Sequence, residues 1–201
     1  MILVSKNFIL QVSIPMLRAF DILFSLGGIA TTFPLMVLIY IAGFFDTGAP
    51  LFFQQRIGKN QELFWLVKFR TMPINTKSVG THLVSTTSIT KLGHVLRKTK
   101  LDELPQLFNV LLGNMSLVGP RPCLSNQTQL ISERAKRGVF NCKPGITGLA
   151  QVNNIDMSTP RKLAIYDKLM IDNMSIQLFL KLIISTALGK GRGDRVRVNN
   201  T

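Results

Sequence analysis

The sequence is poor in the residues from which metal centres and redox sites are built. Its two cysteines, Cys123 and Cys142, fit neither the spacing of a CxxC redox pair nor that of a zinc site. Its two histidines, His82 and His94, stand in polar sequence without ligand spacing. We therefore interpret both histidines as ordinary surface or loop residues and expect a reducing, cytosol-facing compartment.

Acidic residues are also scarce. The chain of 201 residues has 10 Asp and Glu against 24 Lys and Arg, a formal net charge of +14. Such a charge attracts polyanions, namely nucleic acid, anionic lipid head groups or phosphorylated substrates. The mean hydropathy is nevertheless positive, at +0.27, which is unusual for a soluble nucleic-acid-binding domain. Charge and hydropathy together favour a membrane surface, and the length suits one functional unit.

One long run, Ile22 to Phe45, contains no charged residue. As a helix it is long enough to cross a bilayer, and it lacks the small-x-small site at which a signal peptide is cleaved. Pro34 lies near its middle and predicts a kink, because proline removes one backbone hydrogen bond. We expect the hydroxyls of Thr31 and Thr32 to satisfy the carbonyl groups freed at the break.

Basic residues stand on both sides of this run. Lys6 and Arg18 precede it, and a second basic group follows it, comprising Arg56, Lys59, Lys68 and Arg70. The positive-inside rule places such residues on the cytoplasmic face, so both ends are expected on one side. We predict a re-entrant membrane helix within residues 1–47, broken at Thr32 and Pro34. The alternative is an ordinary kinked transmembrane helix.

The rest of the chain predicts a mainly α fold with a small β-hairpin. The hairpin is expected from residues 51–55 and 63–69, and a Ser/Thr-rich loop from 76–90. Helical spacing of apolar residues predicts helices around 92–96, from 102 to 112, after 122, and over 163–171 and 176–188. We expect a globular domain over 48–188, held at the membrane surface by its last helix, and a flexible basic tail over 189–201.

Asp102 and Glu103 are the first candidates for chemistry. They follow a basic run, from Arg97 to Lys100, and open the predicted helix, whose N-terminus would stabilise negative charge. An aspartate at such a place suits attack on a phosphoryl centre, and adjacent carboxylates suit magnesium bound together with substrate oxygens. The alternative is structural, because Asp at an N-cap and Glu in a first turn are common helix signals.

Further cations accompany this pair. Arg121 lies in the segment GPRP, where flanking prolines restrict the backbone and suit bidentate binding of phosphate; the alternative is a surface arginine in a turn. Lys68 lies near the end of an apolar strand, where interfacial anchoring is the alternative function. The turn-rich segment 143–148, KPGITG, offers backbone donors to an anion, although such glycine turns are common.

Three segments carry a resemblance to a known family: KFRTM at 68–72, LDELPQLFNVLLGNMSLVGPRP at 101–122 and PGITGLAQV at 144–152. With them the chain resembles the monotopic phosphoglycosyl transferases, or bacterial sugar transferases, from about Arg18 to Ser175. It looks like the minimal single-domain form, because the extra multi-span N-terminal region of larger relatives is lacking.

The resemblance implies an enzyme that moves a sugar 1-phosphate from a UDP-sugar to polyprenyl phosphate, usually undecaprenyl phosphate, and releases UMP. By this resemblance Asp102 attacks the phosphate on the sugar and carries a covalent intermediate. Glu103 and Asp167 match the family's acidic residues, and the resemblance implies both as ligands of Mg²⁺, with Glu103 the residue that the family associates with the ion. Lys68, Arg97 and Arg121 would face the phosphates.

The same resemblance implies a place for the protein. A monotopic enzyme of this kind lies in the bacterial inner membrane, with its active site on the cytoplasmic face, where lipid phosphate and soluble nucleotide sugar meet. It catalyses the first membrane step in the synthesis of an O-antigen, capsule, exopolysaccharide or glycoprotein glycan. Downstream glycosyltransferases are then expected partners, together with membrane lipid.

Some residues depart from the family pattern. Phe33 precedes Pro34 where serine is common, Leu169 and Met170 replace tyrosines, and Leu149 replaces a tryptophan. None of these changes touches Asp102 or Glu103, so they bear on sugar specificity and on the role of Asp167 rather than on the central chemistry. The presence of Asp102, Glu103 and Arg121 also argues against an inactive member of the family.

A competing class is a membrane-tethered basic protein that binds nucleic acid or anionic lipid without catalysis. It accounts for the net charge and for the apolar segment. It does not account for cations gathered around an Asp-Glu pair, and the basic tail lacks the aromatic residues on which single-stranded bases stack. We therefore expect no nucleic-acid partner.

Overall fold

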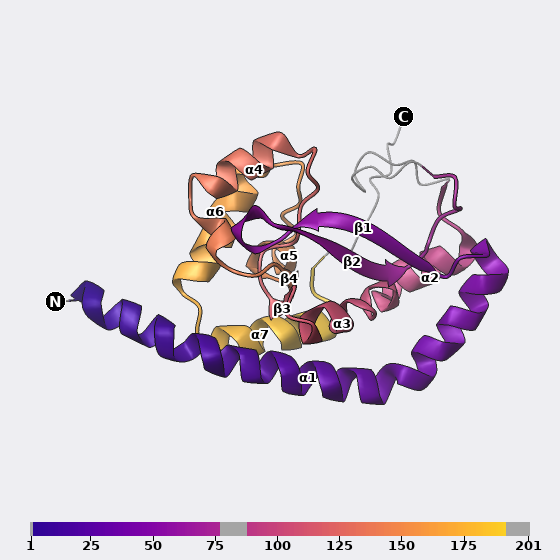
Figure 1. The fold of residues 1–201 in the computed structure, drawn as a ribbon, viewed down its shortest axis with the longest axis horizontal. Coiled ribbons are helices and arrows are strands. Elements are labelled where there is room, and N and C mark those ends of the chain that lie inside the picture. The colour runs from indigo at the N-terminus through magenta and orange to yellow at the C-terminus, as the bar shows by residue number, and fades with distance from the viewer. Residues whose placement is uncertain (1, 77–87, 192–201) are drawn as a thin grey trace.

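The computed structural model describes residues 2–76 and 88–191, with side chains from residue 15 onward. A single long helix, α1 (Ile2–Thr47), runs along one side of the molecule, and the remaining elements pack above it (Figure 1). Residues 77–87 of the predicted loop, with His82, and residues 192–201 of the predicted tail lie outside the described residues. The predicted class is confirmed, since helices predominate beside a small antiparallel hairpin.

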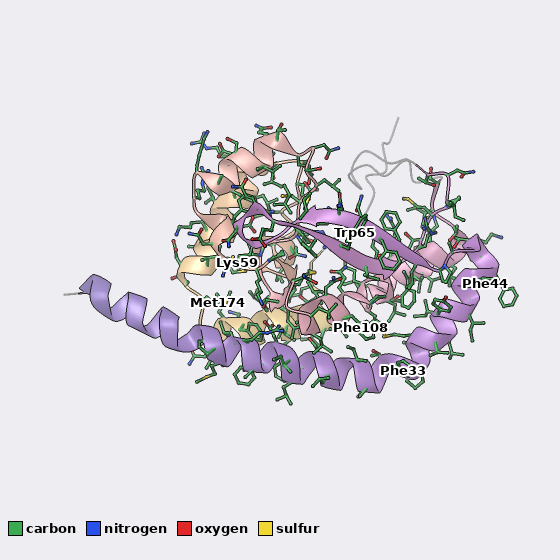
Figure 2. All side chains as sticks on the ribbon, in the orientation of Figure 1. Phe33, Phe44, Lys59, Trp65, Phe108 and Met174 are labelled. Atoms are coloured by element: carbon green, nitrogen blue, oxygen red, sulfur yellow. The ribbon has the colours of Figure 1, made fainter. Side chains whose placement is uncertain are left out.

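Helix α1 contains the predicted membrane segment. Its stretch Pro15–Thr47 has 33 residues and a mean hydropathy of 2.1, so it is long and apolar enough to cross a membrane. Large apolar side chains such as Leu38 and Phe45 are exposed along it. The helix continues through Pro34 but turns there toward the hairpin, and Phe33 lies at the turn (Figure 2). The kink expected from proline is therefore present.

The threonines beside Pro34 bond differently from the prediction. The Thr31 hydroxyl donates to the carbonyls of Gly27 and Gly28 at 2.8 and 3.1 Å, and the Thr32 hydroxyl donates to Gly28 at 2.7 Å. The carbonyl that loses its donor to a proline at position 34 is four residues back, at position 30. The hydroxyls thus bond one turn too early to replace the missing donor, because a threonine reaches its own i−4 carbonyl.

The hairpin pairs β1 (Leu51–Ile57) with β2 (Leu63–Phe69) in antiparallel register, from Leu51 opposite Phe69 to Ile57 opposite Leu63. Strand β1 is two residues longer than predicted. Alternation along the strands gives the hairpin two faces. The inner face is buried, and the outer face exposes apolar side chains, among them Trp65.

Two short helices flank the hairpin. Helix α2 (Lys91–Thr99) begins where the Thr90 hydroxyl accepts from the Gly93 amide at 2.9 Å, which is an N-cap. Helix α3 (Gln106–Leu111) lies under β2, and its Asn109 side chain extends the strand edge. The Asn109 amide donates to the Trp65 carbonyl at 2.7 Å and accepts from the Val67 amide at 3.1 Å.

A second sheet was not predicted. Strands β3 (Ser116–Val118) and β4 (Gly145–Thr147) pair in parallel, so the GPRP and KPGITG segments lie side by side. The backbones approach so closely that a side chain on Gly145 would collide with the backbone of Gly119. A strand of three residues is too short for its periodicity to be seen in the sequence.

The remaining helices complete the core. They are α4 (Thr128–Ala135), α5 (Leu149–Val152), α6 (Pro160–Asp172) and α7 (Ile176–Ala187). The helices predicted at 163–171 and 176–188 are confirmed. The main apolar cluster joins β2, α3, β3, α6 and α7, through buried residues such as Leu66, Val110 and Phe179.

Polar side chains fasten α1 to this core. The Arg18 guanidinium donates to the carbonyls of Val110 and Leu111 at 2.7 and 3.0 Å, where α3 ends without partners of its own. Asp21 is buried and accepts from the Leu117 amide at 2.8 Å and from the Ser116 hydroxyl at 3.0 Å. The long helix is thereby fixed relative to α3 and β3.

Candidate functional site

Asp102 and Glu103 lie in a tight turn rather than in the predicted helix. The turn is a 3₁₀ segment, Leu101–Glu103, and α3 starts only at Gln106, so the helix expected over 102–112 is wrong at its beginning. Pro105 explains the break, because it has no N–H to donate back to the Leu101 carbonyl. That carbonyl instead accepts from the Leu104 amide at 3.3 Å, three residues on.

Both carboxylates are buried at this turn. Asp102 is 2% exposed and Glu103 is 8% exposed. The turn packs against β2, which carries Lys68, and against α2, which carries Arg97. Helix α3 has only six residues and begins after both carboxylates. The stabilisation of negative charge that was expected from a helix N-terminus is therefore weak here.

Arg121 forms an ion pair with Glu103. The distance from Nη2 of Arg121 to Oε1 of Glu103 is 2.9 Å, and both side chains are largely shielded from solvent. The GPRP segment that carries Arg121 follows β3 directly. The structure thus places Arg121 beside the acidic pair, while its role as a phosphate-binding cation stays a prediction.

A second arginine, Arg134 on α4, holds the backbone of Arg121. Its Nη1 donates to the Arg121 carbonyl at 2.8 Å, while its Nε and Nη2 approach Oδ2 of Asp167 at 2.9 and 2.8 Å. Arg134 is 1% exposed and Asp167 is 2% exposed. Burial raises the pKa of the Asp167 carboxyl, and the Arg134 guanidinium opposes that shift.

These contacts pair Asp167, one of the two predicted metal ligands, with Arg134. Asp167 bonds to Arg134, and Arg134 bonds to the backbone carbonyl of Arg121. The Arg121 side chain in turn pairs with Glu103. No group of three metal-ligating side chains occurs in the part of the chain that the structure describes. Asp167 thus has a structural partner that the sequence did not reveal, while its role as a metal ligand stays a prediction.

Arg121 lines two hollows. The first is lined by Arg56, Lys68, Gln106 and Arg121. The second is lined by Lys100, Glu103, Arg121, Thr147 and Gln151. Lys68 and Arg121 therefore line one hollow, and their role as phosphate-facing cations stays a prediction.

Arg97 lies apart from both hollows. Its Nε donates to the Thr71 hydroxyl at 2.8 Å, which links α2 to the end of β2. Lys68 is 7% exposed, and its Nζ lies 5.6 Å from the centre of the Phe52 ring, within the range of a cation–π contact. Lys68 and Arg121 are therefore brought together at one hollow, whereas Arg97 lines neither of the two, and its phosphate-facing role stays a prediction.

Sequence reasoning missed three contributors to this region. Arg134 and Gln106 were not singled out in the sequence, and Arg56 was assigned only to the basic group that follows the membrane run. A signal was present for Arg56, because Gln54 and Arg56 occupy alternate positions whose cross-strand partners, Leu66 and Phe64, are apolar and buried. Polar side chains on an otherwise apolar, buried strand face need hydrogen-bonding partners. This pattern therefore indicated a polar environment around Arg56.

The cysteines form no metal or redox pair in this region. Both are free, and burial raises the pKa of the Cys142 thiol to about 11. At pH 8 the reactive thiolate is then about one part in a thousand. We expect negligible alkylation of Cys142 by iodoacetamide at pH 8 in the native protein and complete alkylation in denaturant, as measured by mass spectrometry. Full native labelling at pH 8 would contradict the burial of this thiol.

Comparison with known proteins matches most of the chain. The family model described as "Bacterial sugar transferase" matches residues 12–190. An uncharacterized sugar transferase, EpsL, of Bacillus subtilis is 44% identical over 140 residues, covering 69% of this chain and 69% of its own length. The exopolysaccharide production protein PSS of Rhizobium leguminosarum is 33% identical over 195 residues, covering 88% of this chain and 96% of its own length.

A larger relative bears a more specific name. The undecaprenyl-phosphate galactose phosphotransferase of Salmonella typhimurium is 34% identical over 190 residues. The alignment covers 85% of this chain but 39% of that relative. The chain therefore spans less than half of the larger relative that it matches.

Proposed function

The chain belongs to the bacterial sugar transferase family, and we propose that it transfers a sugar 1-phosphate from a UDP-sugar to polyprenyl phosphate. The observation that carries the proposal is the buried pair Asp102 and Glu103, with Glu103 paired to Arg121, which lines two polar hollows. The name of the Salmonella relative supports undecaprenyl phosphate as the acceptor.

The proposed reaction has two displacements at one phosphorus atom. In the first, a carboxylate oxygen of Asp102 attacks the phosphorus bonded to the sugar oxygen, the bond to the bridging oxygen breaks, and UMP leaves with the electron pair. In the second, a phosphate oxygen of the polyprenyl phosphate attacks the same phosphorus and releases the Asp102 carboxylate. The product is a polyprenyl diphosphate sugar, and Lys68 and Arg121 neutralise charge in both steps.

Magnesium is the proposed cofactor. It is commonly held by one or two protein carboxylates and by substrate phosphates rather than by an all-protein cage. Asp102 and Glu103 fit that donor set, since they are adjacent, acidic and buried beside Arg121. Glu103 would hold the ion, which when bound supplies positive charge to offset the diphosphate. Asp167, predicted as a second ligand, is engaged by Arg134.

The proposed place of action is the cytoplasmic face of a bacterial inner membrane. Helix α1 would lie in one leaflet as a re-entrant helix, and the turn at Pro34 and the apolar surface of the helix support this. The site then stands where a lipid phosphate meets a soluble nucleotide sugar. Such a product would enter the synthesis of an exopolysaccharide, capsule, O-antigen or glycoprotein, with downstream glycosyltransferases as partners.

A UMP-release assay tests the reaction. Purified protein in detergent or nanodiscs receives undecaprenyl phosphate, Mg²⁺ and one of a panel of UDP-sugars. We expect release of UMP with at least one donor, a matching polyprenyl diphosphate sugar by mass spectrometry, and loss of both in excess chelator. UMP release with no lipid product from any donor would contradict transfer to the lipid.

The re-entrant placement is tested by labelling Ser5→Cys from each side of the membrane. We expect this cysteine to react from the cytoplasmic side only, because both ends of the membrane segment are proposed to lie there. The native cysteines give a low background, since Cys123 is buried and Cys142 has a raised pKa. Exclusive labelling from the periplasmic side would instead support a helix that crosses the bilayer.

A further inference from the structure

The hollow beside Lys68 gathers more charge than the sequence motifs indicate. Arg56 lies on β1 and is 8% exposed, although guanidinium groups are seldom buried without a task. Two neutral acceptors orient it: its Nη1 donates to the Pro122 carbonyl at 3.1 Å, and its Nη2 donates to Oε1 of Gln54 at 2.6 Å. Arg56 is thereby held at the wall of the cavity.

Lys68 and Arg121 stand at the same cavity as Arg56. Lys68 comes from β2, on the same buried face of the hairpin as Arg56, and Arg121 comes from the loop after β3. No carboxylate is among the residues that line this hollow within 2–76 and 88–191. Arg121 also pairs with Glu103, which lies outside this lining, and the excess of positive side chains at the hollow favours a bound anion.

Gln106 adds a neutral polar group to the same hollow. Its side chain lines the hollow and is 4% exposed. Its amide atoms are not among the fully buried polar atoms that lack a partner in the described residues, so they are accessible to a molecule in the hollow. An amide offers both a donor and an acceptor to a ligand bound there.

We propose that this hollow is a phosphate subsite in which Arg56 is a third cation and Gln106 is a neutral contact. The three cations would bind the oxygens of a phosphoryl group. The Gln106 amide would donate to a phosphate oxygen or exchange hydrogen bonds with a neighbouring hydroxyl. The assignment to a substrate rests on the proposed function, whereas the affinity for phosphate does not.

Inorganic pyrophosphate tests the affinity of the hollow for phosphate separately from its assignment to a substrate, because binding of pyrophosphate needs no turnover. Binding to the purified full chain is measured by calorimetry and by the shift in Tm. We expect Arg56→Gln to weaken pyrophosphate binding by about 10- to 100-fold, the usual range for a lost charge-assisted contact. Arg56→Lys keeps the charge but loses the forked geometry of the guanidinium. Its affinity for pyrophosphate should lie between that of the unmodified protein and that of Arg56→Gln.

Arg70→Gln is the matched control. Arg70 lies at the end of the same hairpin and donates to two backbone carbonyls, those of Ala49 and Leu51, but it does not line the hollow. We expect its pyrophosphate affinity to stay within about twofold of the unmodified protein. A comparable loss in Arg70→Gln and Arg56→Gln would attribute the effect to the hairpin and overturn the proposal.

Gln106→Glu tests the subsite even if Arg56→Gln unfolds. The new carboxylate keeps the shape of the side chain and would pair with the surrounding cations. We expect a higher Tm without ligand and a loss of pyrophosphate binding of at least about 10-fold. A lower Tm with unchanged affinity would overturn the proposal, because a carboxylate buried away from cations destabilises the fold.

Steady-state kinetics then distinguish the two sources of phosphate. If the donor diphosphate occupies the hollow, Arg56→Lys raises KM for the UDP-sugar and leaves KM for undecaprenyl phosphate unchanged. If the lipid phosphate occupies it, the reverse holds, and either result supports the subsite. Unchanged KM for both substrates, with unchanged pyrophosphate affinity, overturns it even in a fully active enzyme.

Discussion

Replacement of Asp102 by asparagine should reduce UMP release by at least about 10³-fold, as is usual when a nucleophile is removed. The amide has nearly the shape of the carboxylate but is a poor nucleophile toward phosphorus. Asp102 is 98% shielded from solvent in a turn whose neighbours are fixed, so the isosteric change preserves packing better than a truncation. The measurement is the initial rate of UMP release with the cognate UDP-sugar, together with the Tm of the variant.

Asp172→Asn is the control for this loss. Asp172 lies at the end of α6 and pairs with Lys168 one turn away on an exposed surface, at 2.7 Å. Exposed pairs of this kind contribute little to stability, so neither activity nor Tm should change appreciably. Activity of Asp102→Asn comparable with this control, in a folded protein, would remove Asp102 as the nucleophile.

Replacement of Asp167 by asparagine should instead act mainly on stability. The ion pair with Arg134 is buried, and removal of one partner leaves an uncompensated charge, a loss of about 3–5 kcal/mol in the free energy of unfolding. Arg134 also holds the Arg121 backbone, so we expect a lower kcat as well. The measurements are denaturant unfolding and the Mg²⁺ concentration that gives half-maximal rate.

The metal dependence decides between two roles for Asp167. If its task is to neutralise Arg134, the Mg²⁺ concentration for half-maximal rate stays close to that of the unmodified protein despite the lost stability. If Asp167 is a metal ligand, that concentration rises markedly. Asp172→Asn again serves as the control, because it changes an aspartate of the same helix without touching Arg134.

Local patterns in the sequence were sufficient to predict the elements that depend on local forces. The apolar run of α1, the turn at Pro34, the hairpin, and helices α6 and α7 follow from periodicity, proline and strand composition. The turn at Asp102 was predicted as helix because apolar spacing continues through it. The 3₁₀ bonds depend on Pro105 and on packing against β2, which periodicity does not describe.

The candidate site was predictable only in part, because most of it is assembled from distant segments. Asp102, Glu103 and Arg121 stand in recognisable motifs, and the ion pair joins two of them. The contacts made by Arg134 cross between three elements, and no local pattern in α4 indicates them. The parallel pairing of β3 with β4 is likewise non-local, since α4 lies between the two strands.

The covalent step is the central chemical claim, and intact-mass analysis tests it most directly. The purified protein is mixed with Mg²⁺ and the cognate UDP-sugar without any polyprenyl phosphate. The account predicts one added sugar phosphate, located on the peptide that contains Asp102 and lost when undecaprenyl phosphate is supplied. Full turnover with both substrates, but no adduct and no UMP release in the absence of the lipid, would contradict it.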